Sequence, residues 1–241
     1  MRTVAVVLAG GSGHRFGPGV PKQLRLLGDL SLLEHCVATF GQAPAVDDVL
    51  VVAAAEHAVE TRQRLAEVAR LAGVIDGGAA RTDSTRSAID WLAGRDQYAD
   101  DTKVLFHDAA RPLVDARIIA DCITALDSWD AVGVVVPATD TIVEVADGAF
   151  QRVLPRETLA RCQTPQGFRF GVIRQAYELA AADAGFLTLP ATDDCGVVLR
   201  YLPDVAVGAV AGSERNLKIT YAQDMLVAQA LLAADEPGTG G

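Results

Sequence analysis

The chain has 241 residues, half of them hydrophobic, which is the length and composition of one large α/β domain with a substantial core. Its formal net charge is −10, with 31 acidic side chains against 21 Lys and Arg, and this excludes a general basic surface for holding DNA or RNA. The four cysteines show no C-x-x-C pair and no Cys/His spacing typical of zinc, and we interpret them as reduced thiols of a cytoplasmic protein.

The first half of the chain alternates between apolar runs and helical patterns. Runs rich in Val, Leu and Ile predict buried parallel strands at residues 3–9, 48–54, 103–107 and 131–136. Helical spacing predicts helices at residues 32–40, 59–71, 84–92 and 118–126. Because parallel neighbours need right-handed helical crossovers, the pattern predicts a three-layer sheet with helices on both faces and ligands at the carboxyl ends of the strands. The first apolar run is too short to cross a membrane, so we expect no membrane partner.

The regular alternation stops in the second half. Two short strands around a turn at residues 146–148 predict a hairpin over residues 139–162, which either forms a lid or reaches another subunit. Beyond it the sequence predicts helices at residues 170–182, 192–199 and 222–232, and strands at 205–210 and 216–220. We expect one domain over residues 1–235, with residues 139–162 as a β-arm, and a disordered tail over residues 236–241.

The first strand runs into a loop with four glycines, at residues 10–17, whose backbone N–H groups can approach an oxyanion closely. The spacing is not that of a Walker A loop, and Phe16 stands where a dinucleotide fingerprint needs glycine. Arg15 and Lys22 flank the loop and can place two cations on a triphosphate. The alternative is a glycine-rich turn with two solvated basic residues.

At this loop the chain resembles the IspD/TarI family of cytidylyltransferases, whose signature is similar to L-A-G-G-x-G-x-R-x-G followed by P-K-Q. The resemblance continues in order through residues 77–84, 107–112, 140–141, 164–168, 192–193 and 216–220. It implies a Rossmann-like nucleotidyltransferase sheet with a protruding β-hairpin arm. It also implies transfer of CMP from CTP to the phosphate of a small sugar alcohol.

The resemblance assigns roles to particular residues. Those implied to bind CTP are Ala9, Gly10, Gly11, Ser12, Gly13, Gly78, Asp83, Ser84 and Ala109. Those implied to be catalytic, by stabilising charge on the phosphates, are Arg15, Lys22 and Lys218. Those implied to bind the acceptor are Asp108, Arg111, Thr141, Arg156, Thr164 and Thr192. No strong general base is required, and His107 is interpreted as structural.

Asp108 is also the expected metal ligand, because one carboxylate together with phosphate oxygens commonly holds Mg²⁺ or another divalent cation. Its alternative role is a helix N-cap ahead of Ala109. The resemblance further implies that the arm carries Thr141 and Arg156 to a neighbouring subunit, giving a homodimer with shared sites. A purely structural hairpin is the alternative.

The acceptor expected first is 2-C-methyl-D-erythritol 4-phosphate, with D-ribitol 5-phosphate as the alternative. Residues 156–159 and Ala110 look like the methylerythritol branch of the family. Departures at residues 8–11, 140–143 and 194–195 favour ribitol phosphate. A nucleotide-binding protein without turnover is a third possibility, and the intact Lys22, Asp108 and Lys218 argue against it.

Overall fold

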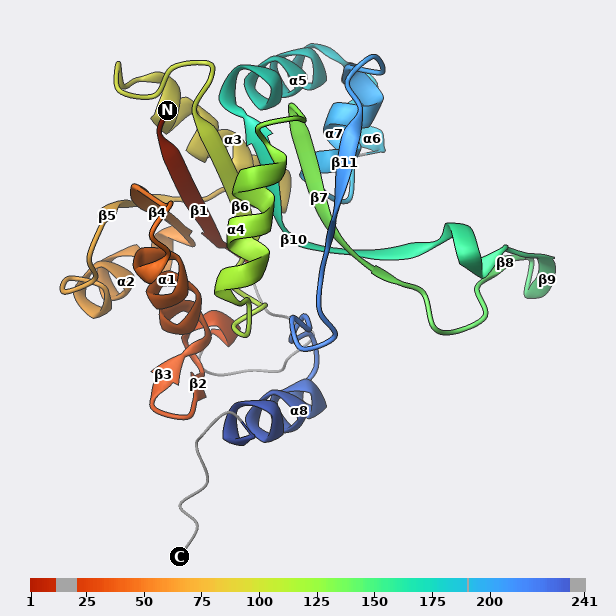
Figure 1. The fold of residues 1–241 in the computed structure, drawn as a ribbon, viewed down its shortest axis with the longest axis horizontal. Coiled ribbons are helices and arrows are strands. Elements are labelled where there is room, and N and C mark those ends of the chain that lie inside the picture. The colour runs from red at the N-terminus through yellow and green to blue at the C-terminus, as the bar shows by residue number, and fades with distance from the viewer. Residues whose placement is uncertain (12–20, 190, 235–241) are drawn as a thin grey trace, which may run out of the picture.

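The computed structural model describes residues 1–11, 21–189 and 191–234. Its central sheet has seven strands in the order β11-β7-β10-β6-β1-β4-β5 (Figure 1). They are β1 (Thr3–Ala9), β4 (Asp48–Ala53), β5 (Leu71–Asp76), β6 (Lys103–Asp108), β7 (Ala131–Pro137), β10 (Ala160–Arg169) and β11 (Val207–Ala211). Strand β10 runs antiparallel to β6 and β7, whereas the other neighbours in this sheet pair in parallel. The expected α/β fold class is therefore confirmed.

Helices cover both faces of this sheet (Figure 1). One face packs against α1 (Leu32–Gln42) and α4 (Ala116–Ala125), and the other against α3 (Arg81–Ala93), α5 (Phe170–Ala182) and α7 (Asp194–Tyr201). Alternate residues of β1 enter the two cores, Val4 and Val6 on one side and Ala5 and Val7 on the other. A strand buried on both faces has no polar side to expose, which explains its continuous apolar run.

Three of the remaining elements lie outside this sandwich. Strands β2 (Leu26–Leu27) and β3 (Leu30–Ser31) form a small hairpin that packs against the last helix, α8 (Ala222–Ala233). Helices α2 (Ala58–Arg64) and α6 (Ala184–Thr188) are short. Within the described residues, no helix is both long and apolar enough to cross a lipid bilayer.

Two expectations about secondary structure are wrong. The helix expected over residues 59–71 ends at Arg64, and Leu71–Asp76 forms the edge strand β5 beside β4. Between them Arg70 takes a positive φ of 64° and donates hydrogen bonds to the carbonyls of Ala43 and Val46, which turns the chain into β5. Residues 216–220 form no strand, because the backbone hydrogen bond that anchors this segment, Ile219 N to Ala110 O, is not continued as a ladder.

The expected hairpin is present as β8 (Val143–Ala146) and β9 (Ala149–Val153). Asp147 and Gly148 have φ values of 52° and 75°, as required at the two central positions of a type I′ turn. In Figure 1 the arm extends from β7 and β10 away from the sheet. Phe150, 73% exposed, is one of several large apolar side chains that the arm presents to solvent.

Candidate active site

The carboxyl ends of β1 and β6 border a cavity of about 380 Å³, here called the first cavity. Its other walls come from the turn at Lys22 and Gln23, the start of α3, and the segment after β11. The lining residues implied to bind nucleotide are Ala9, Gly10, Gly11, Ser84 and Ala109, and those implied to be catalytic are Lys22 and Lys218. Ser12, Gly13 and Arg15 lie outside the described residues. The cavity is where an α/β sheet places its ligand.

The walls of the first cavity are formed by closely packed backbone. A Cβ atom on Gly78 would lie 2.2 Å from Cβ of Asp83, and one on Gly10 would lie 2.8 Å from Oγ of Ser84. Asp83 accepts a hydrogen bond from Ala80 N at 3.0 Å, which fixes the first turn of α3. Gly78 and Asp83 therefore shape the wall from behind and do not line the cavity themselves.

Asp108, the last residue of β6, is held by two cations. Arg81 Nε donates to its Oδ1 at 2.9 Å, and Lys218 Nζ donates to its Oδ2 at 2.7 Å. Burial alone would raise the pKa of Asp108, but the charges and hydrogen bonds of Arg81 and Lys218 outweigh burial and hold that pKa well below its usual range. The carboxylate is ionised at neutral pH.

A second cavity of about 220 Å³ shares these three charged side chains with the first. Arg81, Asp108 and Lys218 thus form the wall between the two spaces. The second cavity also contains three of the residues implied to bind the acceptor, Arg111, Thr164 and Thr192. Among the described residues, the predicted acceptor ligands Thr141 and Arg156 line neither cavity, because both are exposed on the arm.

Arg111 brings a buried cation to the second cavity. Its Nη1 donates to Asn216 O at 2.8 Å and its Nη2 to Cys162 O at 3.3 Å. Its Nε is buried and has no hydrogen-bond partner among the described residues. With Arg81 and Lys218, this guanidinium gives the second cavity three cations against the two carboxylates of Asp108 and Asp193, a balance that favours an anion.

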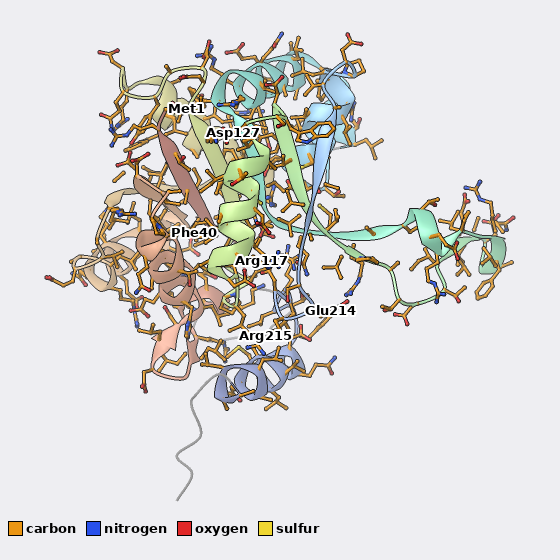
Figure 2. All side chains as sticks on the ribbon, in the orientation of Figure 1. Met1, Phe40, Arg117, Asp127, Glu214 and Arg215 are labelled. Atoms are coloured by element: carbon orange, nitrogen blue, oxygen red, sulfur yellow. The ribbon has the colours of Figure 1, made fainter. Side chains whose placement is uncertain are left out.

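His107 is a fully buried residue that supports this site from below. Its Nε2 lies 3.0 Å from Arg111 O, and since a carbonyl only accepts, Nε2 carries the hydrogen. Nδ1 then accepts from Thr164 Oγ1 at 3.1 Å, and Oγ1 in turn accepts from Asp108 N. Burial lowers the pKa of His107 to about 4, so the ring is neutral at pH 7. Its ring lies edge-to-face with the ring of Phe40, labelled on α1 in Figure 2, with the two ring centroids 5.1 Å apart.

The sequence interpretation missed two residues of this centre, Arg81 and Asp194. Arg81 pairs with Asp108 and also lies 2.8 Å from Oδ2 of the fully buried Asp194, as an ion pair without hydrogen-bond geometry. The signals were present, since Arg81 stands inside the glycine-rich motif at residues 77–84 and Asp194 directly follows Thr192 and Asp193.

The residues present fit a divalent cation that takes most of its ligands from a phosphate. Asp108 is the one carboxylate among the described residues lining the first cavity. No described group of three or more His, Cys, Asp or Glu side chains is arranged to hold a metal ion by itself. Each oxygen of Asp108 accepts a hydrogen bond from one basic side chain and keeps further lone-pair capacity for a cation.

Comparison with known proteins gives a consistent set of similarities. Residues 3–234 match the family model described as "IspD: 2-C-methyl-D-erythritol 4-phosphate cytidylyltransferase". The 2-C-methyl-D-erythritol 4-phosphate cytidylyltransferase of Thermobifida fusca is 48% identical over 238 residues, covering 96% of this chain and 93% of that protein. The solved 4-diphosphocytidyl-2C-methyl-D-erythritol synthase of Anaerococcus prevotii superposes with a TM-score of 0.82 at 25% identity, covering 96% of this chain and 98% of that one.

A further relative carries a different name. The bifunctional ribulose 5-phosphate reductase/CDP-ribitol pyrophosphorylase of Haemophilus influenzae is 35% identical over 234 residues. The match covers 95% of this chain but 48% of that protein. The chain is therefore similar to one half of a bifunctional enzyme.

Proposed function

Since the chain belongs to the 2-C-methyl-D-erythritol 4-phosphate cytidylyltransferase family, we propose that it transfers CMP from CTP to the phosphate of 2-C-methyl-D-erythritol 4-phosphate and releases pyrophosphate. The observation that carries the proposal is the pair of adjoining cavities with Arg81, Asp108 and Lys218 as their common wall. A nucleotide in the first and a phosphate in the second would meet at that wall.

CTP binds in the first cavity with its base against the backbone of Gly10, Gly11 and Ser84. Because a Cβ atom at Gly10 would already touch Ser84, this wall is close and suits a pyrimidine better than a purine. The triphosphate extends towards Lys22 and Lys218, and Arg15 is proposed to join them from the glycine-rich loop.

An acceptor phosphate oxygen attacks the α-phosphorus of CTP in line. The new P–O bond forms as the bond from the α-phosphorus to the bridging oxygen breaks, and pyrophosphate leaves with that electron pair. Because the acceptor phosphate is an anion at neutral pH, no general base is needed, which agrees with the neutral, buried His107. Alignment and charge neutralisation by Lys22 and Lys218 lower the barrier.

Asp108 would hold Mg²⁺ or another divalent cation together with phosphate oxygens. When bound, the metal ion neutralises charge on the phosphates. The chain's own contribution is to keep Asp108 ionised through Arg81 and Lys218.

The active unit is proposed to be a homodimer in which Thr141 and Arg156 complete the second cavity of the neighbouring subunit. The exposed apolar side chains of the arm, Val145, Phe150 and Val153, support an interface there. A cytoplasmic location is proposed as well, since all four cysteines are free.

D-ribitol 5-phosphate is the second candidate acceptor. It is supported by the Haemophilus influenzae relative and by the departures from the usual family sequence at residues 8–11, 140–143 and 194–195.

The proposed nucleotide specificity is tested by following acceptor-dependent pyrophosphate release with CTP, ATP and GTP. We expect turnover with CTP and far less with either purine. Equal turnover with ATP would contradict the assignment of the first cavity.

A further inference from the structure

Asp194 is a completely buried carboxylate that the proposed reaction does not use directly. Its Oδ1 accepts hydrogen bonds from Tyr177 OH at 2.7 Å and from Thr85 Oγ1 at 3.0 Å. Its Oδ2 faces Arg81, with 2.8 Å between Oδ2 and Nη2. Two hydroxyl groups therefore hold one carboxylate oxygen, and a guanidinium faces the other.

The backbone at Asp194 is fixed as firmly as its side chain. Gln166 Oε1 on β10 accepts from Asp194 N at 3.0 Å and from Cys195 N at 3.1 Å. Gln166 Nε2 donates to Asp193 Oδ2 at 2.8 Å, and Asp193 Oδ1 caps the first turn of α7. The carboxylate of Asp194 therefore stands at a point set by the central sheet.

Arg81 links this fixed point to the reaction centre. The guanidinium of Arg81 bridges two carboxylates, Asp194 on one side and Asp108 on the other. Asp108 in turn forms an ion pair with Lys218. Arg81 and Asp108 are largely buried, whereas the Lys218 side chain is 43% exposed and reaches both cavities. This series of contacts thus runs from the buried Asp194 to the partly exposed Lys218.

We propose that Asp194 is a positioning residue for CMP transfer: by holding Arg81, it fixes Asp108 and so places Lys218 in the wall between the two cavities. This role rests on the function proposed above. Asp194 touches neither cavity's contents itself, and it acts through Arg81.

The first test is Asp194→Asn, which keeps an oxygen for Tyr177 and Thr85 but removes the charge opposite Arg81. We expect kcat to fall about 10- to 100-fold, the usual effect of losing a group that orients a ligand-binding residue. The KM for CTP should change far less than kcat, because the base wall at Gly10 and Ser84 is unaltered. Tyr177→Phe is the matched control, since it removes a hydrogen bond from the same carboxylate and leaves the ion pair, and it should keep wild-type kcat.

The second test asks whether Asp194 acts through Arg81. In an Arg81→Met background, which is already impaired, Asp194→Asn should cause no further loss of kcat, because two groups in one chain of contacts are not additive. A multiplicative further loss would overturn the proposal. So would an Asp194→Asn variant that keeps wild-type kcat, or one that loses no more than Tyr177→Phe.

A readout independent of turnover is the NMR signal of the Arg81 Nε–H group, assigned by its absence in Arg81→Met. In the wild-type protein this hydrogen is held by Asp108 and should exchange slowly with water, and in Asp194→Asn it should exchange faster. Unchanged exchange would mean that Asp194 does not hold Arg81, and it overturns the proposal whatever happens to kcat. If the wild-type protein released no pyrophosphate with any acceptor, the proposed function would fail, and the exchange rates would still decide the link between Asp194 and Arg81.

Discussion

Lys218 and Asp108 lie 110 residues apart in the sequence, yet Lys218 Nζ donates a hydrogen bond to Asp108 Oδ2 at 2.7 Å in the wall between the two cavities. The segment that carries Lys218 has no regular secondary structure, so its position depends on individual contacts. Ile219 N donates to Ala110 O at 2.8 Å, and Lys22 Nζ donates to Ile219 O at 2.8 Å. One of the two lysines proposed for catalysis, Lys22, therefore helps to hold the backbone next to the other, Lys218.

Lys22→Ala should lower kcat by about 100- to 1000-fold, the usual cost of removing one group that stabilises developing charge. Thermal unfolding should remain close to wild type, because the side chain is only partly buried. Steady-state kinetics and melting curves check both statements. Arg64→Ala, which removes a surface cation on α2, serves as the control. A folded Lys22→Ala protein with wild-type kcat would show that Lys22 has another role.

Gly78→Ala should damage the first cavity, because the new Cβ atom would lie 2.2 Å from Asp83 Cβ and must push the start of α3 away from the segment after β5. We expect a higher KM for CTP together with a lower melting temperature. Gly94→Ala, at the other end of α3, is the matched control, since its Cβ would meet its neighbours at an ordinary 3.7 Å. If both variants bind CTP like the wild-type protein, the close wall is not needed for the nucleotide.

His107 should make stability depend on pH. Burial lowers its pKa to about 4 in the folded protein, against about 6.5 in an unfolded chain, so on acidification the unfolded state takes up the proton first. The free energy of unfolding should therefore fall between about pH 6.5 and pH 4, by about 3 kcal/mol from this group.

Urea unfolding at pH 7 and pH 4.5 measures this fall. His107→Gln should show a clearly smaller loss of stability over that interval, whereas His57→Gln, at a partly exposed position, should behave like the wild-type protein. An equal fall in the free energy of unfolding in the wild-type protein and in His107→Gln would contradict a neutral, buried His107.

Arg156→Ala should raise the KM for the acceptor and leave the KM for CTP unchanged. A charge-assisted contact to the acceptor phosphate is worth about 1.5–3 kcal/mol, equivalent to a rise on the order of 10- to 100-fold. Arg152→Ala is the control on the same arm, because that side chain pairs with Glu144. A proportional change in both KM values would remove Arg156 from the acceptor site.

The shared site predicts complementation between two inactive variants. Mixing Arg156→Ala with Lys22→Ala should give heterodimers in which one site carries both lesions and the other carries neither. Activity per heterodimer should recover to at most about half of the wild-type value. No recovery after verified subunit exchange would mean that Arg156 and Lys22 serve the same subunit's site.

Patterns local in the sequence predicted much of this fold. Apolar runs predict the buried strands β1, β4, β6 and β7. The pair Asp147 and Gly148 predicts the turn of the arm. Strand β5 was missed because the helix expected over residues 59–71 was extended to Leu71, where the strand begins, and the short run that follows becomes a strand by pairing with β4. Strand β10 was not expected because its polar, proline-containing sequence gains burial only between β6 and β7.

In the candidate site, too, local sequence predicts some residues, whereas others depend on long-range contacts. Residues in the glycine-rich motifs, such as Gly10 and Ser84, could be assigned to the nucleotide because these local motifs resemble those of the family. The ion pair of Arg81 with Asp194 joins α3 to α7, and nothing in the local sequence at either end reports the other. Long-range pairs of this kind depend on the completed packing of the sheet and its helices.

The identity of the acceptor is the central claim, and one side-by-side measurement tests it most directly. Pyrophosphate release from CTP is followed with 2-C-methyl-D-erythritol 4-phosphate and with D-ribitol 5-phosphate, and the product is identified by ³¹P NMR as a CDP-linked polyol. We predict that both turnover and the diphosphate product appear with methylerythritol phosphate, at a higher kcat/KM than with ribitol phosphate. A higher kcat/KM with ribitol phosphate, or no acceptor-dependent release with either compound, would contradict it.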